Sequence, residues 1–166
     1  MTEDIEIPAV PEAPATADPR LPRRLSPTLR GRPGYLIAQA HLAMAAAAAD
    51  ALSGFGLTTK HYACLVMIGE AGEPAGISQA TLVEQSNIDR STMVAIVDEL
   101  ERAGYVSRTR NPADRRAYAL AVTDAGRDWA AEVSAALREM ESEQLAGLSA
   151  AERERLLTLL QQLLEG

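Results

Sequence analysis

The chain has 166 residues and a mass of 17.7 kDa, which is enough for one domain with extensions. Apolar residues make up 47% of the chain and aromatic residues only 4%, which favours close-packed helices over an aromatic-rich β-sandwich. A single cysteine excludes an internal disulfide framework, and the sequence shows neither a secretory leader nor an apolar run that could cross a bilayer. We therefore expect a soluble, cytoplasmic protein without a membrane partner.

The net charge of −7 argues against nucleic-acid binding only as long as it is taken over the whole chain. Residues 34–103 and 124–166 are both acidic, whereas residues 104–123 contain four arginines and one aspartate. Exposed charges are screened beyond about 8–10 Å at physiological salt, so a local basic segment can hold DNA within an acidic protein.

Residues 1–33 contain seven of the nine prolines of the chain. Proline at this density prevents a helix and leaves too little apolar surface for a core, so we expect a disordered Pro-rich tail. Its second half is basic and could contact a phosphate backbone, although a solvated leader without a role is the simpler interpretation.

Helical patterns dominate from residue 34 onward. Residues 34–56 are rich in Ala and Leu and end in two glycines, which predicts a first helix. A second helix is expected to begin at Thr58 or Thr59, and a short third helix covers 78–85. A fourth begins at about Asp89, its N-cap, and is expected to bury an apolar face made of Met93, Val94, Val97 and Leu100.

The pattern changes from helical to alternating between residues 105 and 123. Segments 106–110 and 117–122 alternate as strands do, and the turn-rich segment 111–115 lies between them, which predicts a basic β-hairpin. A long helix follows from Asp124 to about Leu145, and Ser149 is expected to cap a last helix.

This order of elements predicts a mainly α protein with a small β-hairpin wing, that is, a winged helix-turn-helix. In such a fold, the second helix of the pair lies in the DNA major groove with its first turn on the base edges, and a basic hairpin reaches the backbone or minor groove. Arg90, Ser91 and Thr92 occupy that first turn. Arginine can bind guanine through two hydrogen bonds, and the hydroxyls can bond to bases or phosphates.

Four segments together resemble the MarR (multiple antibiotic resistance regulator) family. They are Asp89-Arg90-Ser91-Thr92, the stretch from Asp98 to Val106, Asn111 to Arg116, and Leu120 to Gly126. The resemblance extends from about residue 34 to the C-terminus. It implies a homodimeric winged-helix repressor, or in some relatives an activator, whose terminal helices form the dimer. Many such proteins release DNA when they bind a small, often phenolic, ligand.

The resemblance also implies an organisation and a set of site residues. The regions are a tail (1–33), a dimerisation helix (34–56), a winged helix-turn-helix domain (57–123) and C-terminal dimerisation helices (124–166). The resemblance places Arg90, Ser91 and Thr92 at the start of the recognition helix, which lies in the major groove, and Asp114 and Arg116 at the wing tip. Together with Ala95 and the other arginines of the hairpin, the expected DNA-binding residues are Arg90, Ser91, Thr92, Ala95, Arg108, Arg110, Asp114, Arg115 and Arg116. In such wings an arginine enters the minor groove and the aspartate orients it. The sequence departs from the family pattern at Val94 and Ala95, where many relatives carry Thr or Ser and then Arg, so fewer polar base contacts are expected.

A dimer is also expected from the residues themselves. The last helix carries a leucine stripe, and the first helix is rich in alanine, so that a second copy is the simplest cover for both. Two wings would then bind half-sites about 34 Å apart on a pseudo-palindrome.

Other roles for single residues remain open. His41, His61 and Tyr62 are candidates for an aromatic or phenolic effector site, with core or surface roles equally compatible. His41, His61 and Cys64 could make a zinc-responsive regulator, and Cys64 alone a thiol-responsive one, but core packing is favoured for Cys64 and no metal site is expected. Trp129 is expected to anchor the core rather than stack on a ligand.

Two function classes compete with DNA binding. An enzyme would need a nucleophile with its base, a carboxylate pair or a phosphate loop, and the sequence offers none, so we expect neither catalytic residues nor a cofactor. A winged helix used only for protein contacts would not explain four arginines in one hairpin.

Overall fold

The structure is a computed structural model that describes residues 26–71, 76–86, 88–110 and 118–165. The chain divides into two compact units, residues 1–46 and 47–166. The predicted fold class is confirmed, because helices make up most of the described chain and the only strands described form one small sheet. No helix in these ranges is long and apolar enough to span a membrane.

The first unit contains a 3-10 turn, η1 (Leu29–Gly31), and most of helix α1 (Pro33–Ala51). Residues 29–33, which the sequence assigned to the tail, therefore include ordered elements. Proline is favourable as the first residue of a helix because its missing N–H would have no partner there. The helix ends at Ala51, just before the two glycines that the sequence assigned to its C-terminal end.

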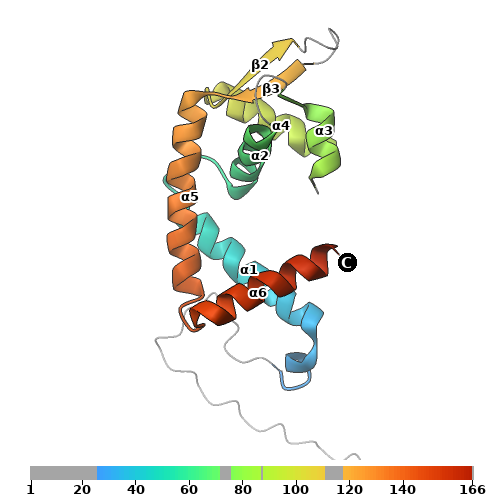
Figure 1. Ribbon diagram of the computed structural model, residues 1–166, viewed down its shortest axis with the longest axis vertical. Coiled ribbons are helices and arrows are strands. Elements are labelled where there is room, and N and C mark those ends of the chain that lie inside the picture. The colour runs from blue at the N-terminus through green and yellow to red at the C-terminus, as the bar shows by residue number, and fades with distance from the viewer. Residues whose placement is uncertain (1–25, 72–75, 87, 111–117, 166) are drawn as a thin grey trace, which may run out of the picture. The chain divides into compact units, whose positions relative to one another are not determined.

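The second unit holds the remaining elements (Figure 1). They are α2 (Thr59–Glu70), β1 (Ile77–Ser78), α3 (Gln79–Gln85), α4 (Arg90–Arg102), β2 (Val106–Arg110), β3 (Tyr118–Val122), α5 (Asp124–Gln144) and α6 (Ala150–Glu165). Three predicted caps are confirmed. The side chains of Asp89 and Thr123 accept backbone N–H bonds at the starts of α4 and α5, and Ser149 does the same for α6.

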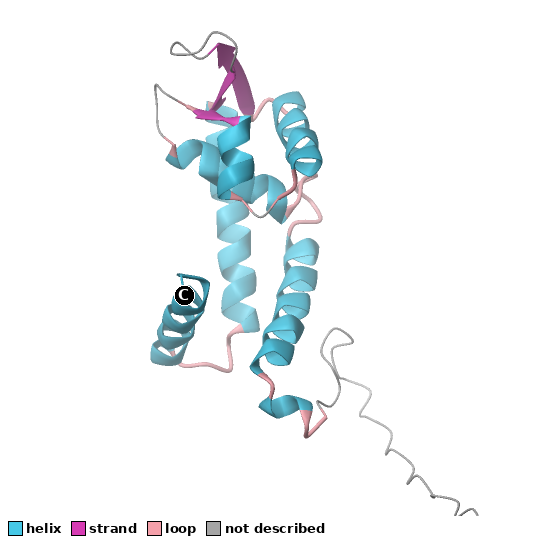
Figure 2. Cartoon of the chain, turned by 90° about the vertical axis from the view of Figure 1, so that its right-hand side faces the viewer, coloured by secondary structure: helices cyan, strands magenta, loops and turns pink. Residues whose placement is uncertain are grey.

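The wing belongs to a three-stranded antiparallel sheet in the order β1-β3-β2, shown in magenta in Figure 2. The sequence predicted only the two hairpin strands and missed β1, because two residues are too few to show an alternating pattern. β1 pairs Ile77 with Leu120 of β3. Gly76 precedes it with φ +59°, and a Cβ there would lie 2.7 Å from the Leu120 carbonyl oxygen, so glycine is required for this close approach.

The two faces of helix α4 differ sharply in burial. Met93, Ile96, Val97 and Leu100 are buried, and the helix packs on α2, α3 and β2. The sequence also placed Val94 on this buried face, and that prediction is wrong: its side chain is 41% exposed. Val94 follows Met93 by one residue, which turns it about 100° from the centre of the face.

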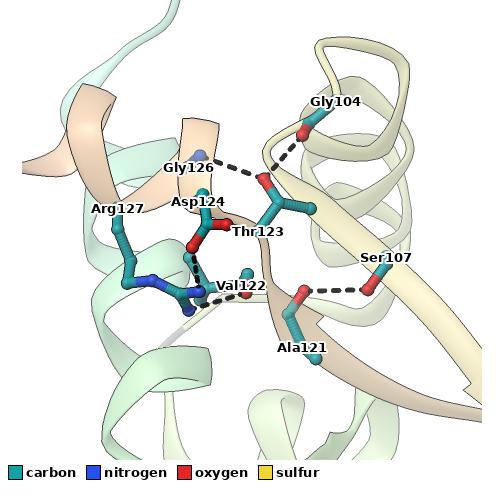
Figure 3. A network of polar contacts seen from close by, with 8 residues as sticks. All are labelled: Gly104, Ser107, Ala121, Val122, Thr123, Asp124, Gly126 and Arg127. Atoms are coloured by element: carbon teal, nitrogen blue, oxygen red, sulfur yellow. Dashed lines mark hydrogen bonds and ion pairs between the residues drawn. The ribbon is translucent and has the colours of Figure 1, made fainter.

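The end of α4, the base of the wing and the start of α5 meet at one junction (Figure 3). The Thr123 hydroxyl donates to the Gly104 carbonyl at 2.7 Å and accepts the Gly126 N–H at 3.0 Å. The Thr123 N–H donates to the Tyr105 carbonyl at 3.0 Å. The Tyr105 ring stacks on Trp129 of α5 with the ring centres 5.2 Å apart, which adds an apolar contact between the end of α4 and α5.

The junction predicts that Gly126 tolerates no side chain. A Cβ at this position would lie 2.2 Å from the Tyr105 carbonyl oxygen, so Gly126→Ala forces the backbone apart and should destabilise the fold by about 2–3 kcal/mol or more. Thermal unfolding followed by circular dichroism, at equal protein concentrations, measures the effect.

The matched control is Gly69→Ala in α2, where the nearest side-chain atom to a new Cβ would be Val122 Cγ2 at 3.7 Å, an ordinary contact. This variant should be neutral or stabilised by about 0.5–1 kcal/mol through helix propensity. Equal Tm values for the two variants would contradict the close approach.

Candidate nucleic-acid interface

The first turn of α4 is organised by one carboxylate. Asp89 accepts the Thr92 N–H at 3.0 Å, the Thr92 hydroxyl at 2.6 Å and the Ser91 hydroxyl at 2.5 Å. The side-chain bonds from Ser91 and Thr92, followed by the backbone bond, hold the pKa of this carboxyl far below its usual range. The cap is therefore ionised at any pH at which DNA binding is measured.

This network changes what the predicted contact residues can offer. The hydroxyls of Ser91 and Thr92 donate their protons to Asp89, so only their oxygen lone pairs remain for DNA. The same cap fixes the position of Arg90, which is exposed at the first helical position.

The outward face of α4 continues with apolar residues. Val94 and Ala95 are both exposed one turn after Arg90 and Ser91. Arg90 and Val94 border a hollow of about 230 Å³ whose other lining residues are Gln79, Ala80, Val83 and Glu84 of α3. The helix-turn-helix pair thus presents arginine, small polar groups and methyl groups on one surface.

The arginines predicted to line the wing fall into two groups. Arg108 is engaged by α4: its Nη2 contacts Asp98 Oδ1, and its Nε lies 3.0 Å from Glu101 Oε2 without the alignment of a hydrogen bond. The guanidinium therefore ties β2 to the C-terminal half of the recognition helix. The one sequence signal near this pairing is that Asp98 and Glu101 lie three residues apart on one helix face.

The second group comprises the remaining predicted wing residues. The backbone of Arg110 pairs with Tyr118, but its side chain and all of Asp114, Arg115 and Arg116 lie outside the described residues. Their roles stay predictions from the sequence.

His61 joins α2 to the recognition helix. It is 7% exposed; its Nδ1 accepts the Thr58 N–H at 3.2 Å, and its Nε2 donates to Glu99 Oε2 at 2.7 Å. No local sequence pattern indicates the contact between His61 and Glu99, because the two residues are 38 positions apart. Tyr62 is half-buried against the core, and His41 is exposed on α1.

Cys64 and Trp129 are core residues, as the sequence predicted. The Cys64 side chain is fully buried with its Sγ 3.7 Å from Met93 Sδ, and burial raises the pKa of the thiol to about 11. Trp129 is 6% exposed and stacks on Tyr105. Among the residues that the structure describes, no three histidine, cysteine or carboxylate side chains form a group that could hold a metal ion.

Comparison with known proteins gives relatives of one kind. Residues 55–117 match the family model described as MarR family. The chain is 37% identical over 108 residues to a protein of Thauera aromatica named as a transcriptional regulatory protein for the hcr operon. That match spans 65% of this chain and 63% of the relative, which is less than two thirds of the relative's length.

Solved structures match over most of the chain. A probable transcriptional regulator from Pseudomonas aeruginosa is 34% identical with a TM-score of 0.71, over 81% of this chain and 98% of that chain. The repressor CouR bound to a 23-mer DNA duplex is 27% identical with a TM-score of 0.75, over 84% and 98%. CouR from Rhodococcus jostii RHA1 bound to p-coumaroyl-CoA is 28% identical with a TM-score of 0.70, over 83% and 95%.

The helix pair α3–α4 with its three-stranded wing defines a winged helix-turn-helix protein. The chain belongs to the MarR family, and the relatives it matches are named as transcriptional regulators rather than enzymes.

Because the Cys64 thiol is buried, we expect it to react slowly with thiol reagents in the native protein. At pH 7.5 the native protein should react with a thiol reagent such as Ellman's reagent about a hundredfold or more slowly than the unfolded protein, because the thiolate is scarce and covered. Cys64→Ser provides the background. Rapid reaction of the native thiol would favour the thiol-responsive alternative instead.

Proposed function

We propose that the protein is a homodimeric repressor that binds a pseudo-palindromic operator and is released by a small-molecule effector. In each protomer, α4 lies in the major groove and the wing arginines contact the adjacent minor groove. The observation that carries the proposal is the two-faced α4, whose outward face is exposed and positioned by a cap.

Charge supports binding through this surface. The chain carries a net charge of −7, so attraction to DNA has to come from local groups. Arg90 supplies one cation at the start of α4, and the hairpin supplies Arg110, Arg115 and Arg116. A wing arginine would then recognise the enhanced negative potential of a narrow minor groove.

The dimer is supported by α6, none of whose residues is buried. Exposed large apolar residues follow one another along this helix: Leu157, Leu159, Leu160, Leu163 and Leu164. A monomer rarely leaves such a contiguous apolar surface in water, and a two-fold axis would cover both copies with one interface. The same axis sets the two α4 helices about one DNA turn apart.

An effector is supported by the related repressor CouR, which has been solved with p-coumaroyl-CoA. We infer an aromatic or phenolic ligand, with Tyr62 and His61 as candidate contacts. His61 could pass a ligand's effect to α4, because its Nε2 bonds to Glu99 on that helix. A thiol-responsive regulator and a winged helix that binds only protein are the remaining alternatives.

The test is a titration of the full-length protein against its own upstream intergenic DNA at several salt concentrations. A nanomolar, sequence-selective complex with a steep salt slope is expected. If the protein binds its upstream DNA no more tightly than random DNA, the alternative of a winged helix that binds only protein is favoured.

Arg116→Ala should weaken operator binding by more than about tenfold, because an arginine inserted in the minor groove both neutralises phosphates and recognises shape. Fold and oligomeric state should not change. Arg138→Ala, which removes an exposed arginine of α5, is the charge-matched control and should bind as the parent does. Equal affinities for all three proteins would remove the wing from the mechanism.

Leu163→Asp should dissociate the dimer, since burying a carboxylate in each copy of an apolar interface is costly. We expect the dimer Kd to rise by about a hundredfold or more in sedimentation equilibrium, with parallel loss of operator binding. Gln161→Asp adds the same charge to an exposed α6 position and should stay dimeric. A monomeric parent protein would overturn the proposal.

A further inference from the structure

We propose that Val94, with Ala95 beside it, recognises thymine by contact with the 5-methyl groups in the major groove. The inference rests on the proposed function, because it assigns part of the sequence selectivity to the outward face of α4. It assigns a specificity-determining role to the residue that the sequence pattern placed in the core.

First, the outward face of α4 offers few hydrogen-bond donors. The hydroxyls of Ser91 and Thr92 are committed as donors to Asp89, at 2.5 and 2.6 Å. Arg90 is then the one residue of the first turn whose side chain offers N–H donors to a base. Discrimination at the remaining base pairs then depends on the acceptor oxygens of Ser91 and Thr92 and on contacts that are not polar.

The second step is the position of Val94. Residues 90, 91, 94 and 95 are exposed neighbours on the helix surface, since 90 and 94, like 91 and 95, are four residues apart. Met93, Ile96 and Val97 occupy the opposite, buried face. Because Val94 lies one turn after Arg90 on the same surface, it would face the major groove if Arg90 does.

The third step is the chemistry of valine at an exposed helical site. Valine has lower helix propensity than alanine, lysine or arginine, and a 41% exposed valine leaves methyl groups in water. Its branched Cβ restricts χ1, so its methyl groups are held in a fixed direction. A fixed apolar surface on a DNA-facing helix matches the one apolar feature of the major groove, the thymine methyl group.

The occupant is DNA rather than a peptide because charged residues rim the patch. Arg90 and Glu84 border the hollow that Val94 lines, so no continuous apolar groove is available for an amphipathic helix. An isolated methyl contact between an arginine and small residues suits a base edge.

The experiment begins with selection of duplexes from a random pool by the full-length protein. Each thymine of the selected half-site is then replaced by deoxyuridine, which removes only the methyl group, and Kd is measured for every duplex. The parent protein should lose about fourfold in affinity at one or two thymines, and about fifteenfold when both half-sites are changed.

Two variants of Val94 complete a double-mutant cycle between this side chain and the thymine methyl group. Val94→Ala should bind thymine and uracil duplexes with nearly equal Kd, and Val94→Thr, which keeps one methyl group, should fall between it and the parent. Arg90→Ala is the matched control: it should bind both duplexes more weakly and keep the parent's ratio. Circular dichroism confirms folding, which an exposed position should not disturb.

The outcomes separate this inference from the proposed function. Failure to select any duplex would overturn the proposed function itself. Selective binding with the same Kd for thymine and uracil would overturn only the role of Val94. An equal thymine preference in the parent and in Val94→Ala would assign the methyl contact to another residue and contradict the inference.

Discussion

The close approach of Gly126 to the Tyr105 carbonyl determines how the DNA-binding elements are held together. Because a Cβ would lie 2.2 Å from that oxygen, α5 can begin directly against the chain that leaves α4. Thr123 closes the same point with bonds to Gly104 and Gly126 (Figure 3). The recognition helix, the base of the wing and α5 therefore share one rigid junction. Arg108 adds a second tie between α4 and the wing through Asp98 and Glu101. A change in α5 would in this way reach both α4 and the base of the wing.

The two faces of α4 divide the work between stability and recognition. The buried face supplies the centre of the core, and its Met93 packs against Cys64 of α2. The outward face is positioned by the Asp89 cap, which is ionised at working pH and holds the first turn in place. The same cap accepts the hydroxyl protons of Ser91 and Thr92. Holding the helix start in place therefore leaves fewer hydrogen-bond donors for the bases. Arg90 and Val94 then carry most of the chemistry available for base recognition in our account.

Much of the fold could be predicted from the sequence because its signals are local. The Asp89, Thr123 and Ser149 caps and the hairpin turn fixed the main boundaries through short-range hydrogen bonding and turn chemistry. β1 was missed because two residues carry no periodicity, and it depends on the glycine contact at Leu120. Val94 was misassigned because an apolar residue next to a core position resembles core. The partner of His61 lies 38 residues away, a long-range contact that one sequence cannot reveal. The pairing of Arg108 was missed because the spacing of Asp98 and Glu101 does not say which cation they bind.

The most direct test of the account is footprinting of the full-length protein on its selected operator, with a major-groove probe and a minor-groove probe on the same duplex. The account predicts two protected major-groove segments about one helical turn apart, each flanked by minor-groove protection from a wing. It also predicts that Leu163→Asp abolishes the paired pattern. A single protected segment, or minor-groove protection without any protection in the major groove, would contradict the central claim that two copies of α4 recognise the bases.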